Sequence, residues 1–292
     1  MTVGSGSFTY EIAEGWGEQP SEWRWGWNVG MACDSNDRVF VYGRSEKPLN
    51  VYSREGKLLE TWGEDILPEN TAHGLFIDQD DNVFCTAFSA HAIYKFNAKG
   101  EHVMTMGTPG TEGQEDGIPF RQPTDLVVAP SGDIYVSGGY GNARVHRYSS
   151  TGTLLHSWGE WGTGPGQFEL SHCVRIDRHQ RVWVCDRAND RIQIFDLDGN
   201  YLSEWNGLAE PNTIFFDPNE EVVYVAELQH QLSIYTMDQQ LITQWGGRKP
   251  SDGPNGFLGG VHGIWMDSHG DLYTGEVLID EKSRMHKYIR KQ

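Results

Sequence analysis

Residues 171–205 read SHCVRIDRHQRVWVCDRANDRIQIFDLDGNYLSEW, and this stretch decides the fold. Its segments CVRID, RVWVCD, IQIFD and YLSEW have the length and the β-branched and aromatic content of strands, and LDGN supplies a hairpin turn before the last one. Four antiparallel strands in a unit of about 40 residues are typical of a propeller blade. The stretch therefore predicts one blade.

The same unit recurs along the chain. Six copies can be aligned, and they begin at Asn28, Ala72, Pro123, Ser171, Pro211 and Val261. Because the copies fill nearly all of the chain, we predict a single domain over residues 1–292, an all-β, six-bladed β-propeller. The last copy lacks a fourth strand, and FTYEIAEGWGE near the start resembles the fourth-strand segments GKLLETWGE and GTLLHSWGE. Residues 8–17 are thus predicted to complete the last blade as its outer strand and so close the ring.

Composition excludes several classes of function. A net charge of −18 disfavours nucleic acid and anionic membrane surfaces, both of which attract basic proteins. The chain has no run of 18 apolar residues, so no transmembrane helix is predicted. The start, MTVGSGSFTY, lacks the features of a secretory signal, and four cysteines without metal-type spacing are expected to be buried free thiols. A cytoplasmic location is therefore expected.

Three histidines occupy one position of the repeat, in alternate copies only. Across the six copies this position reads Val29, His73, Asp125, His172, Asn212 and His262. If six blades close into a ring, the three imidazoles point at one axial point, and three neutral imidazoles with an open fourth position are typical of catalytic zinc. We predict about one zinc ion per chain. Asp125 and Asn212 are expected to hydrogen-bond to the metal ligands or to line the pocket.

A second position completes the predicted pocket. The strand after each histidine position runs back antiparallel, so its end returns to the same face. That end reads Arg44, Phe88, Tyr140, Arg187, Leu228 and Val277. Two arginines, a tyrosine and a phenylalanine around a metal predict a pocket for a small anionic substrate, with Arg44, Arg187 and Phe88 among its binding residues.

With these residues in place, the chain resembles the peptidyl-α-hydroxyglycine α-amidating lyase family, a branch of the NHL-repeat propellers. The resemblance is strongest in FRQPTDLVVAPSGDIYVSGGYGNARVHRYSSTGTLLHSWGE, GPGQFELSHCVRID and VCDRANDRIQIF, and it extends over roughly residues 28–288. It implies a catalytic zinc held by His73, His172 and His262. It also implies Tyr140 as the catalytic tyrosine, with Arg44 and Arg187 binding the substrate carboxylate.

The resemblance implies a reaction as well. The family's chemistry is cleavage of a carbinolamine C–N bond, which releases an amide or amine and an aldehyde such as glyoxylate. The family also binds a calcium ion, and its carbonyl ligands correspond to Met31 and Leu75, but the ligating Asp is replaced by Gly263, so calcium is doubtful. Gly141 and Ile194 stand where family half-cystines would be. The hydroxylating partner domain is absent, which favours a small metabolite as substrate.

Two alternatives to the lyase stay open. The same metal and side chains could activate water against a lactone, imide or other small organic acid derivative, which would make the protein a metal-dependent hydrolase or hydratase. Many propellers of this type are interaction modules, and fold alone does not decide function. The sequence leaves the exact substrate and the oligomeric state open.

Overall fold

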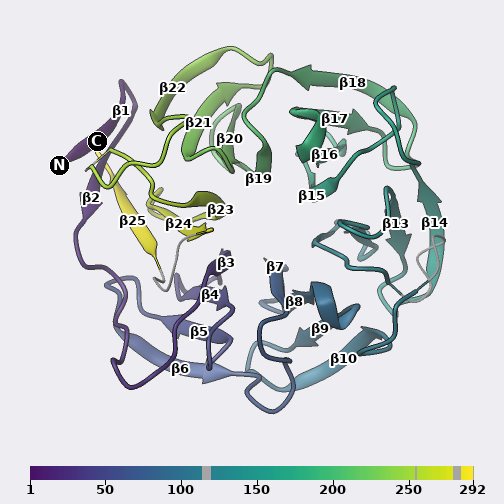
Figure 1. The fold of residues 1–292 in the computed structure, drawn as a ribbon, viewed down its shortest axis with the longest axis horizontal. Coiled ribbons are helices and arrows are strands. Elements are labelled where there is room, and N and C mark those ends of the chain that lie inside the picture. The colour runs from purple at the N-terminus through teal and green to yellow at the C-terminus, as the bar shows by residue number, and fades with distance from the viewer. Residues whose placement is uncertain (114–119, 254, 279–283, 292) are drawn as a thin grey trace. The chain divides into compact units, whose positions relative to one another are not determined.

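The computed structural model describes residues 1–113, 120–253, 255–278 and 284–291. The chain divides into two compact units, Met1–Asn70 with Asn212–Gln292, and Thr71–Pro211. Each unit contains three antiparallel sheets, numbered here as blades 1 to 6 in chain order (Figure 1). Six blades confirm the predicted class, an all-β six-bladed β-propeller. The single domain over residues 1–292 stays a prediction.

The unit Thr71–Pro211 holds blades 2, 3 and 4, and each has four strands in sequential order. Its strands are β7 (Ala72–Ile77), β8 (Val83–Ala87), β9 (Ala92–Phe96), β10 (His102–Gly107), β11 (Asp125–Val128), β12 (Ile134–Ser137), β13 (Val145–Tyr148), β14 (Leu154–Trp158), β15 (Ser171–Ile176), β16 (Val182–Asp186), β17 (Arg191–Phe195) and β18 (Tyr201–Asn206). Two single-turn 3₁₀ helices follow second strands, η1 (Phe88–Ala90) and η2 (Arg187–Asn189).

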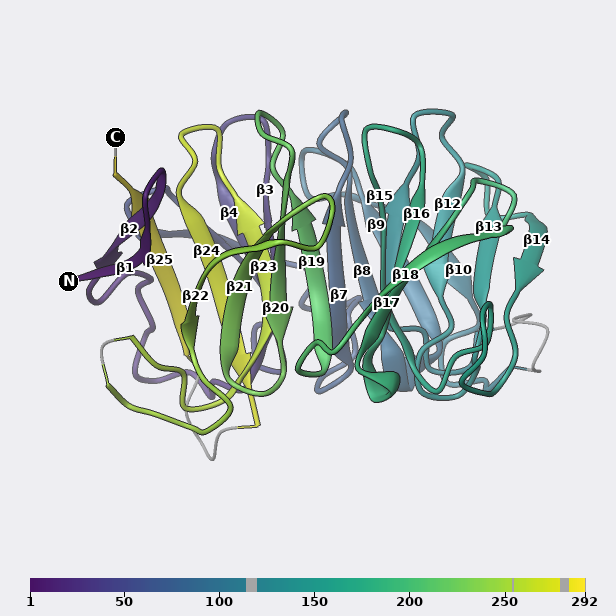
Figure 2. The ribbon, with the colours of Figure 1, turned by 90° about the horizontal axis from the view of Figure 1, so that it is seen from above.

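The other unit holds blades 1, 5 and 6 (Figure 2). Its strands are β3 (Asn28–Cys33), β4 (Val39–Gly43), β5 (Leu49–Tyr52), β6 (Leu58–Trp62), β19 (Pro211–Phe216), β20 (Val222–Glu227), β21 (Gln231–Thr236), β22 (Leu241–Gly246), β23 (Gly260–Met266), β24 (Leu272–Val277), β25 (Met285–Arg290), β1 (Thr2–Ser5) and β2 (Phe8–Ala13). No helix among the described residues has the length and apolarity that a membrane crossing requires.

Burial follows the order of strands within a blade. Second strands such as β4 and β16 are buried along their whole length, whereas fourth strands such as β6 and β14 have exposed residues and end on a buried tryptophan. Trp158 at the end of β14 shares a hydrophobic cluster with Val174 and Phe195 of the next blade. The tryptophan at the end of the fourth strand therefore packs between two blades.

The N-terminal strand joins the C-terminal blade, as predicted. β2 pairs antiparallel with β25, with Tyr10 opposite Arg290 and Ala13 opposite Lys287. The predicted bounds were wrong, because the strand ends at Ala13 and residues 14–17 lie outside it. The prediction that this strand is outermost was also wrong: residues 2–5 form β1, a fifth strand outside β2.

Deleting residues 1–18 is expected to lower the melting temperature by at least about 10 °C, because it removes several buried aromatic side chains, each stabilising by roughly 3–5 kcal/mol. Tyr10 is fully buried and bonds to Tyr224 through the two hydroxyls at 2.8 Å, and Trp16 packs on Tyr52 and Tyr273. Thermal unfolding followed by circular dichroism measures the loss. Deletion of residues 1–5 is the control, with a smaller effect expected. An unchanged melting curve for the longer deletion would contradict the role of β2.

Candidate functional site

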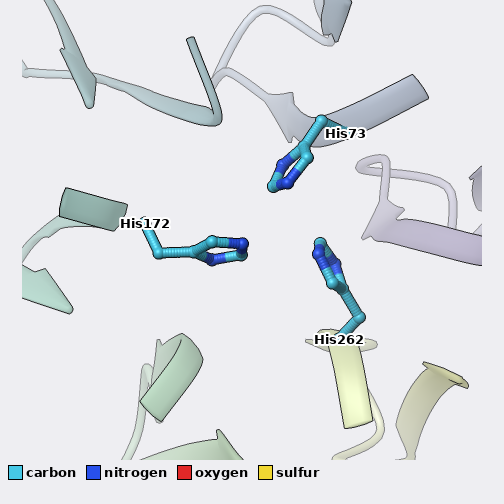
Figure 3. A group of neighbouring side chains, drawn as sticks. All are labelled: His73, His172 and His262. Carbon is cyan, nitrogen blue, oxygen red and sulfur yellow. The ribbon is translucent and has the colours of Figure 1, made fainter. Parts of the chain in front are cut away.

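Two of the predicted histidines come together in the unit Thr71–Pro211. His73 and His172 are each the second residue of a blade's first strand, β7 and β15, so the repeat places them equivalently. Their ring centroids lie 4.7 Å apart, one ring nitrogen of each lies within 4.8 Å of the other, and both residues are about 1% exposed. The rings of these two histidines point into the same space in Figure 3.

The hydrogen bonds of His73 define which nitrogen is available. Its Nδ1 lies 2.7 Å from the carbonyl oxygen of Thr124, which can only accept, so Nδ1 carries the proton and Nε2 carries the lone pair. Gly74 allows this approach: a Cβ added there would lie 2.5 Å from the same Thr124 oxygen. The sequence AHG therefore brings β11 against β7 and orients a neutral imidazole.

Tyr140 stands beside both lone pairs. Its hydroxyl lies 3.2 Å from Nε2 of His73 and 3.4 Å from Nε2 of His172. The guanidinium of Arg187, in η2, lies 5.5 Å from the centre of the Tyr140 ring, which is cation–π distance. Phe88, in η1, makes edge contacts with Tyr140 and His73 at 5.8 and 5.6 Å. Five residues predicted from two repeat positions therefore form one cluster: His73, His172, Phe88, Tyr140 and Arg187.

Asp125 is placed differently from a side chain that simply lines a pocket. It begins β11 and is 5% exposed, and its Oδ2 accepts hydrogen bonds from Nη1 of Arg175 and from the backbone N–H of Val174. Burial raises the pKa of the Asp125 carboxyl, and the guanidinium of Arg175 opposes that rise. Arg175 also donates to the carbonyl of Leu126. The ion pair connects β15, which carries His172, to β11. The residue directly before β11 is Thr124, whose carbonyl accepts the hydrogen bond from His73.

Replacing Asp125 with Ala is expected to lower the free energy of unfolding by about 3–5 kcal/mol, because the buried charge of Arg175 loses its partner. Urea denaturation gives the value. The control is Asp198→Ala, which removes an 80% exposed carboxylate 3.2 Å from Arg147 and should cost no more than about 1 kcal/mol. Equal stability of the two variants would contradict the structural role of the buried pair.

His262 lies in the other unit and repeats the geometry of His73. It is 5% exposed on β23, and its Nδ1 lies 2.7 Å from the carbonyl oxygen of Val29 on β3. Its Nδ1 therefore carries the proton and its Nε2 the lone pair. Asn212, fully buried in β19, donates from its amide to the carbonyl of Val261 at 3.2 Å, so it supports the strand segment that carries His262.

The residue after His262 explains why the calcium ligand of the family has no counterpart. A Cβ added at Gly263 would lie 3.0 Å from the Met31 nitrogen and 3.0 Å from the Val29 oxygen, so β3 would have to shift for any larger residue. The predicted carbonyl positions, Met31 and Leu75, lie within β3 and β7. In VHG, as in AHG, glycine permits the close strand contact that orients the histidine.

Arg44 follows β4 in the same unit as His262. Its guanidinium lies 5.1 Å from the centre of the Trp27 ring, and its backbone N–H donates to the Trp27 carbonyl at 2.9 Å. Gly26 makes this pairing possible, since a Cβ there would meet the Arg44 oxygen at 2.1 Å. The tryptophan-rich stretch of residues 21–28 thus supports a predicted substrate residue. In both predicted substrate arginines the guanidinium lies over an aromatic ring, that of Trp27 for Arg44 and that of Tyr140 for Arg187.

Sequence reasoning missed Arg175, Thr124 and Trp27. A signal existed for Arg175, which is a charged residue inside the otherwise apolar strand segment CVRI and needs a buried partner. Thr124 acts through its carbonyl, which no side-chain pattern reveals. The four cysteines are free and buried, as expected. Burial raises the pKa of the Cys33, Cys85 and Cys173 thiols well above the usual value, so these three stay protonated.

Comparison with known proteins gives matches of three kinds. A family model described as "Lactonase, 7-bladed beta-propeller" matches residues 82–245. The chain is 34% identical over 236 residues to NHL repeat-containing protein 3 of Homo sapiens, covering 75% of this chain and 67% of that protein. It is 30% identical over 173 residues to peptidyl-alpha-hydroxyglycine alpha-amidating lyase 1 of Drosophila melanogaster, covering 55% of this chain and 31% of that protein.

A solved structure titled "Streptogramin B lyase structure" has the same fold. The TM-score is 0.68, and the match covers 98% of this chain and 100% of that chain at 13% sequence identity. The match therefore supports the propeller fold and says nothing of shared chemistry. The resemblance to amidating lyases and NHL-repeat proteins that the sequence predicted is confirmed.

Proposed function

Because the chain belongs to the family of lactonase-type and NHL-repeat β-propellers, we propose that it is a zinc-dependent lyase acting on a small carbinolamine that carries a carboxylate. The observation that carries the proposal is the position of the Tyr140 hydroxyl, within 3.4 Å of the Nε2 atoms of His73 and His172 and under the guanidinium of Arg187. A proton acceptor, metal-type donors and a cation are the groups that this cleavage needs.

The donor set fits zinc. Nδ1 of His73 and Nδ1 of His262 both donate to backbone carbonyls at 2.7 Å, which leaves Nε2 of each as a neutral nitrogen ligand. We propose that His73, His172 and His262 bind one ion and leave a fourth position open. Bound there, zinc would polarise the carbinol oxygen of the substrate. Calcium is not proposed, because Gly263 takes the place of the family's aspartate.

The chain's own residues account for the remaining work. Arg44 and Arg187 bind the substrate carboxylate, and the ring stacked on each guanidinium sets the plane in which its N–H groups donate. Phe88 and the buried strands exclude water from one side of the substrate. Tyr140 acts as the general base and takes the proton of the carbinol hydroxyl. The O–H electron pair becomes the second bond of the aldehyde carbonyl, and the C–N bond breaks. The electron pair of the C–N bond stays on the nitrogen, which takes up the proton held by Tyr140 and leaves as the amide.

One experiment tests the reaction. The purified zinc-loaded protein is incubated with α-hydroxyhippurate in isotopically labelled water, and benzamide and glyoxylate are measured by mass spectrometry. A lyase releases both without adding an oxygen atom in the bond-breaking step, so the benzamide carbonyl stays unlabelled. Release of benzoate, with solvent oxygen in it, would replace the lyase by a hydrolase.

The match to a lactonase family model over residues 82–245 favours one second candidate, hydrolysis of a lactone or related acid derivative. A γ-lactone in the same assay distinguishes it. The non-enzymatic alternative is an interaction module, because many NHL-type propellers are binding platforms, and no stoichiometric zinc is expected for it. We place the protein in a reducing compartment, the cytoplasm, which accords with four free thiols.

A further inference from the structure

One position of the third strand carries a cation in three blades. In each case the cation lies over the aromatic ring of the residue directly opposite on the second strand, at 5.0 to 5.6 Å. The pairs are Lys95 over Phe84, Arg147 over Tyr135, and Lys287 over Tyr273. The repeat therefore builds the same cation–π contact three times.

Two of these cations are neutralised by carboxylates. Arg147 binds Asp133 at 2.7 Å and Asp198 at 3.2 Å, and Lys287 binds Asp271 at 3.1 Å. In these two blades Asp133 and Asp271 stand at the same repeat position, two residues before the aromatic ring of the pair.

Lys95 lacks both carboxylates of that arrangement. The residue two before Phe84 is Asn82, whose side-chain amide donates to Asp78 at 2.9 Å, and the counterpart of Asp198 in blade 3 is Thr151. Among the described residues, Lys95 forms no ion pair, although it is only half-exposed. The Lys95 ammonium is therefore a cation that an anionic ligand could bind.

A cleft of about 390 Å³ lies between blades 2 and 3, and Lys95 and Asn82 line it. Its walls include the apolar side chains of Phe76, Phe84, Val128 and Ile134, and Lys95 lies among them. Its volume falls within the roughly 300–1,000 Å³ usual for small-molecule sites. The cleft lies at the turn end of β7, whereas His73 lies at the other end of that strand, so it is distinct from the candidate functional site.

Lys95, Ser131 and Ser150 are groups of the cleft that can donate to an anion, whereas Asp78 and Asp80 carry negative charge. Asp78 lines it, but both of its carboxylate oxygens accept hydrogen bonds from the turn formed by residues 80–82. Asp80 also lines the cleft and is exposed to solvent, where its charge is screened. Ser131 and Ser150 supply hydroxyl donors.

We propose that this cleft binds a small organic carboxylate with a flat apolar body, the carboxylate on Lys95 and the body against the phenylalanine walls. The proposal is independent of the proposed lyase activity. A charge-assisted hydrogen bond contributes about 1.5–3 kcal/mol, so removing the ammonium should weaken binding by about tenfold or more.

Benzoate is the probe, and benzamide is its neutral counterpart. Isothermal titration of the full chain measures their affinities for the wild type and for three variants. Lys95→Met removes the charge and keeps the side-chain stem, Asn82→Asp restores the carboxylate of the other blades, and Lys99→Met removes an exposed charge of the same hairpin outside the cleft. Benzoate should bind the wild type and Lys99→Met equally and the other two at least about tenfold more weakly.

Three outcomes would overturn the proposal. The first is no benzoate binding to the wild type, and the second is equal affinity for benzoate and benzamide. The third is binding that survives both Lys95→Met and Asn82→Asp but is lost in Arg187→Ala, which would assign the anion to the candidate functional site. Melting curves of the variants show that the cleft itself is intact, and agreement of the two independent variants excludes a folding defect of one of them.

Discussion

Replacing His73, His172 or His262 with Ala is expected to reduce bound zinc from about one ion per chain to almost none. In the proposed site three imidazoles bind the ion and a fourth position is open, so each substitution removes a third of the protein ligands. Loss even of a residue that only supports a ligand costs about 10- to 100-fold in metal affinity, and loss of a ligand should cost more than about 100-fold. Zinc content after dialysis, measured by mass spectrometry, gives the result.

His179→Ala and His269→Ala are the matched controls. Both histidines lie in exposed turns at the ends of the first strands of their blades, so both variants should keep full zinc. Gly74→Ala is a finer probe, since its added methyl would press on the Thr124 carbonyl that orients His73 and should weaken zinc without removing a ligand. Full occupancy in a His73→Ala, His172→Ala double variant would show that the ion binds elsewhere.

Tyr140→Phe is expected to lower kcat on α-hydroxyhippurate by about 100-fold or more, the usual effect of removing a general base, with zinc content unchanged. The phenylalanine ring keeps the edge contacts with Phe88 and His73 and the face beneath Arg187, so only the hydroxyl is lost. Steady-state kinetics with metal analysis of the same sample separates chemistry from metal loss.

The control is Tyr135→Phe, in the same blade. Its hydroxyl donates to the Leu197 carbonyl at 2.9 Å and takes no part in the candidate site, so kcat should stay within about twofold of the wild type because stability alone changes. If Tyr140→Phe turned over substrate as fast as Tyr135→Phe, the tyrosine would be a packing residue under Arg187.

The repeat explains which parts could be predicted. Strands, blade number and the positions of His73, Tyr140 and Arg187 all follow from a period that is visible in the residues themselves, because equivalent residues take equivalent places. The structure also confirms that a strand from the start of the chain joins the last blade.

Two kinds of feature could not be predicted: those that depart from the repeat, and those that depend on a backbone group and not on a side chain. β1 has no counterpart in other blades, so no alignment of copies could reveal it. Asp125 and Arg175 form an ion pair between two different positions of the repeat. The sequence shows that Arg175 is a charged residue in an apolar strand, but it does not show which residue pairs with it. The cleft at Lys95 depends on Asn82 and Thr151, two positions that matter only because neighbouring blades have aspartates there.

The sheet that contains β2 and β25 has a consequence for how the chain matures. Tyr10 pairs with Arg290, so β2 can form its ladder with β25 only after residues 285–290 have been synthesised. Pairing of strands so far apart in the sequence requires closure of a long loop, and the entropy lost in closing it slows folding. Until then β2 has an unpaired edge and exposes Phe8 and Tyr10, both buried in the finished sheet. A nascent chain in which β25 has not yet been made is therefore expected to be prone to aggregation.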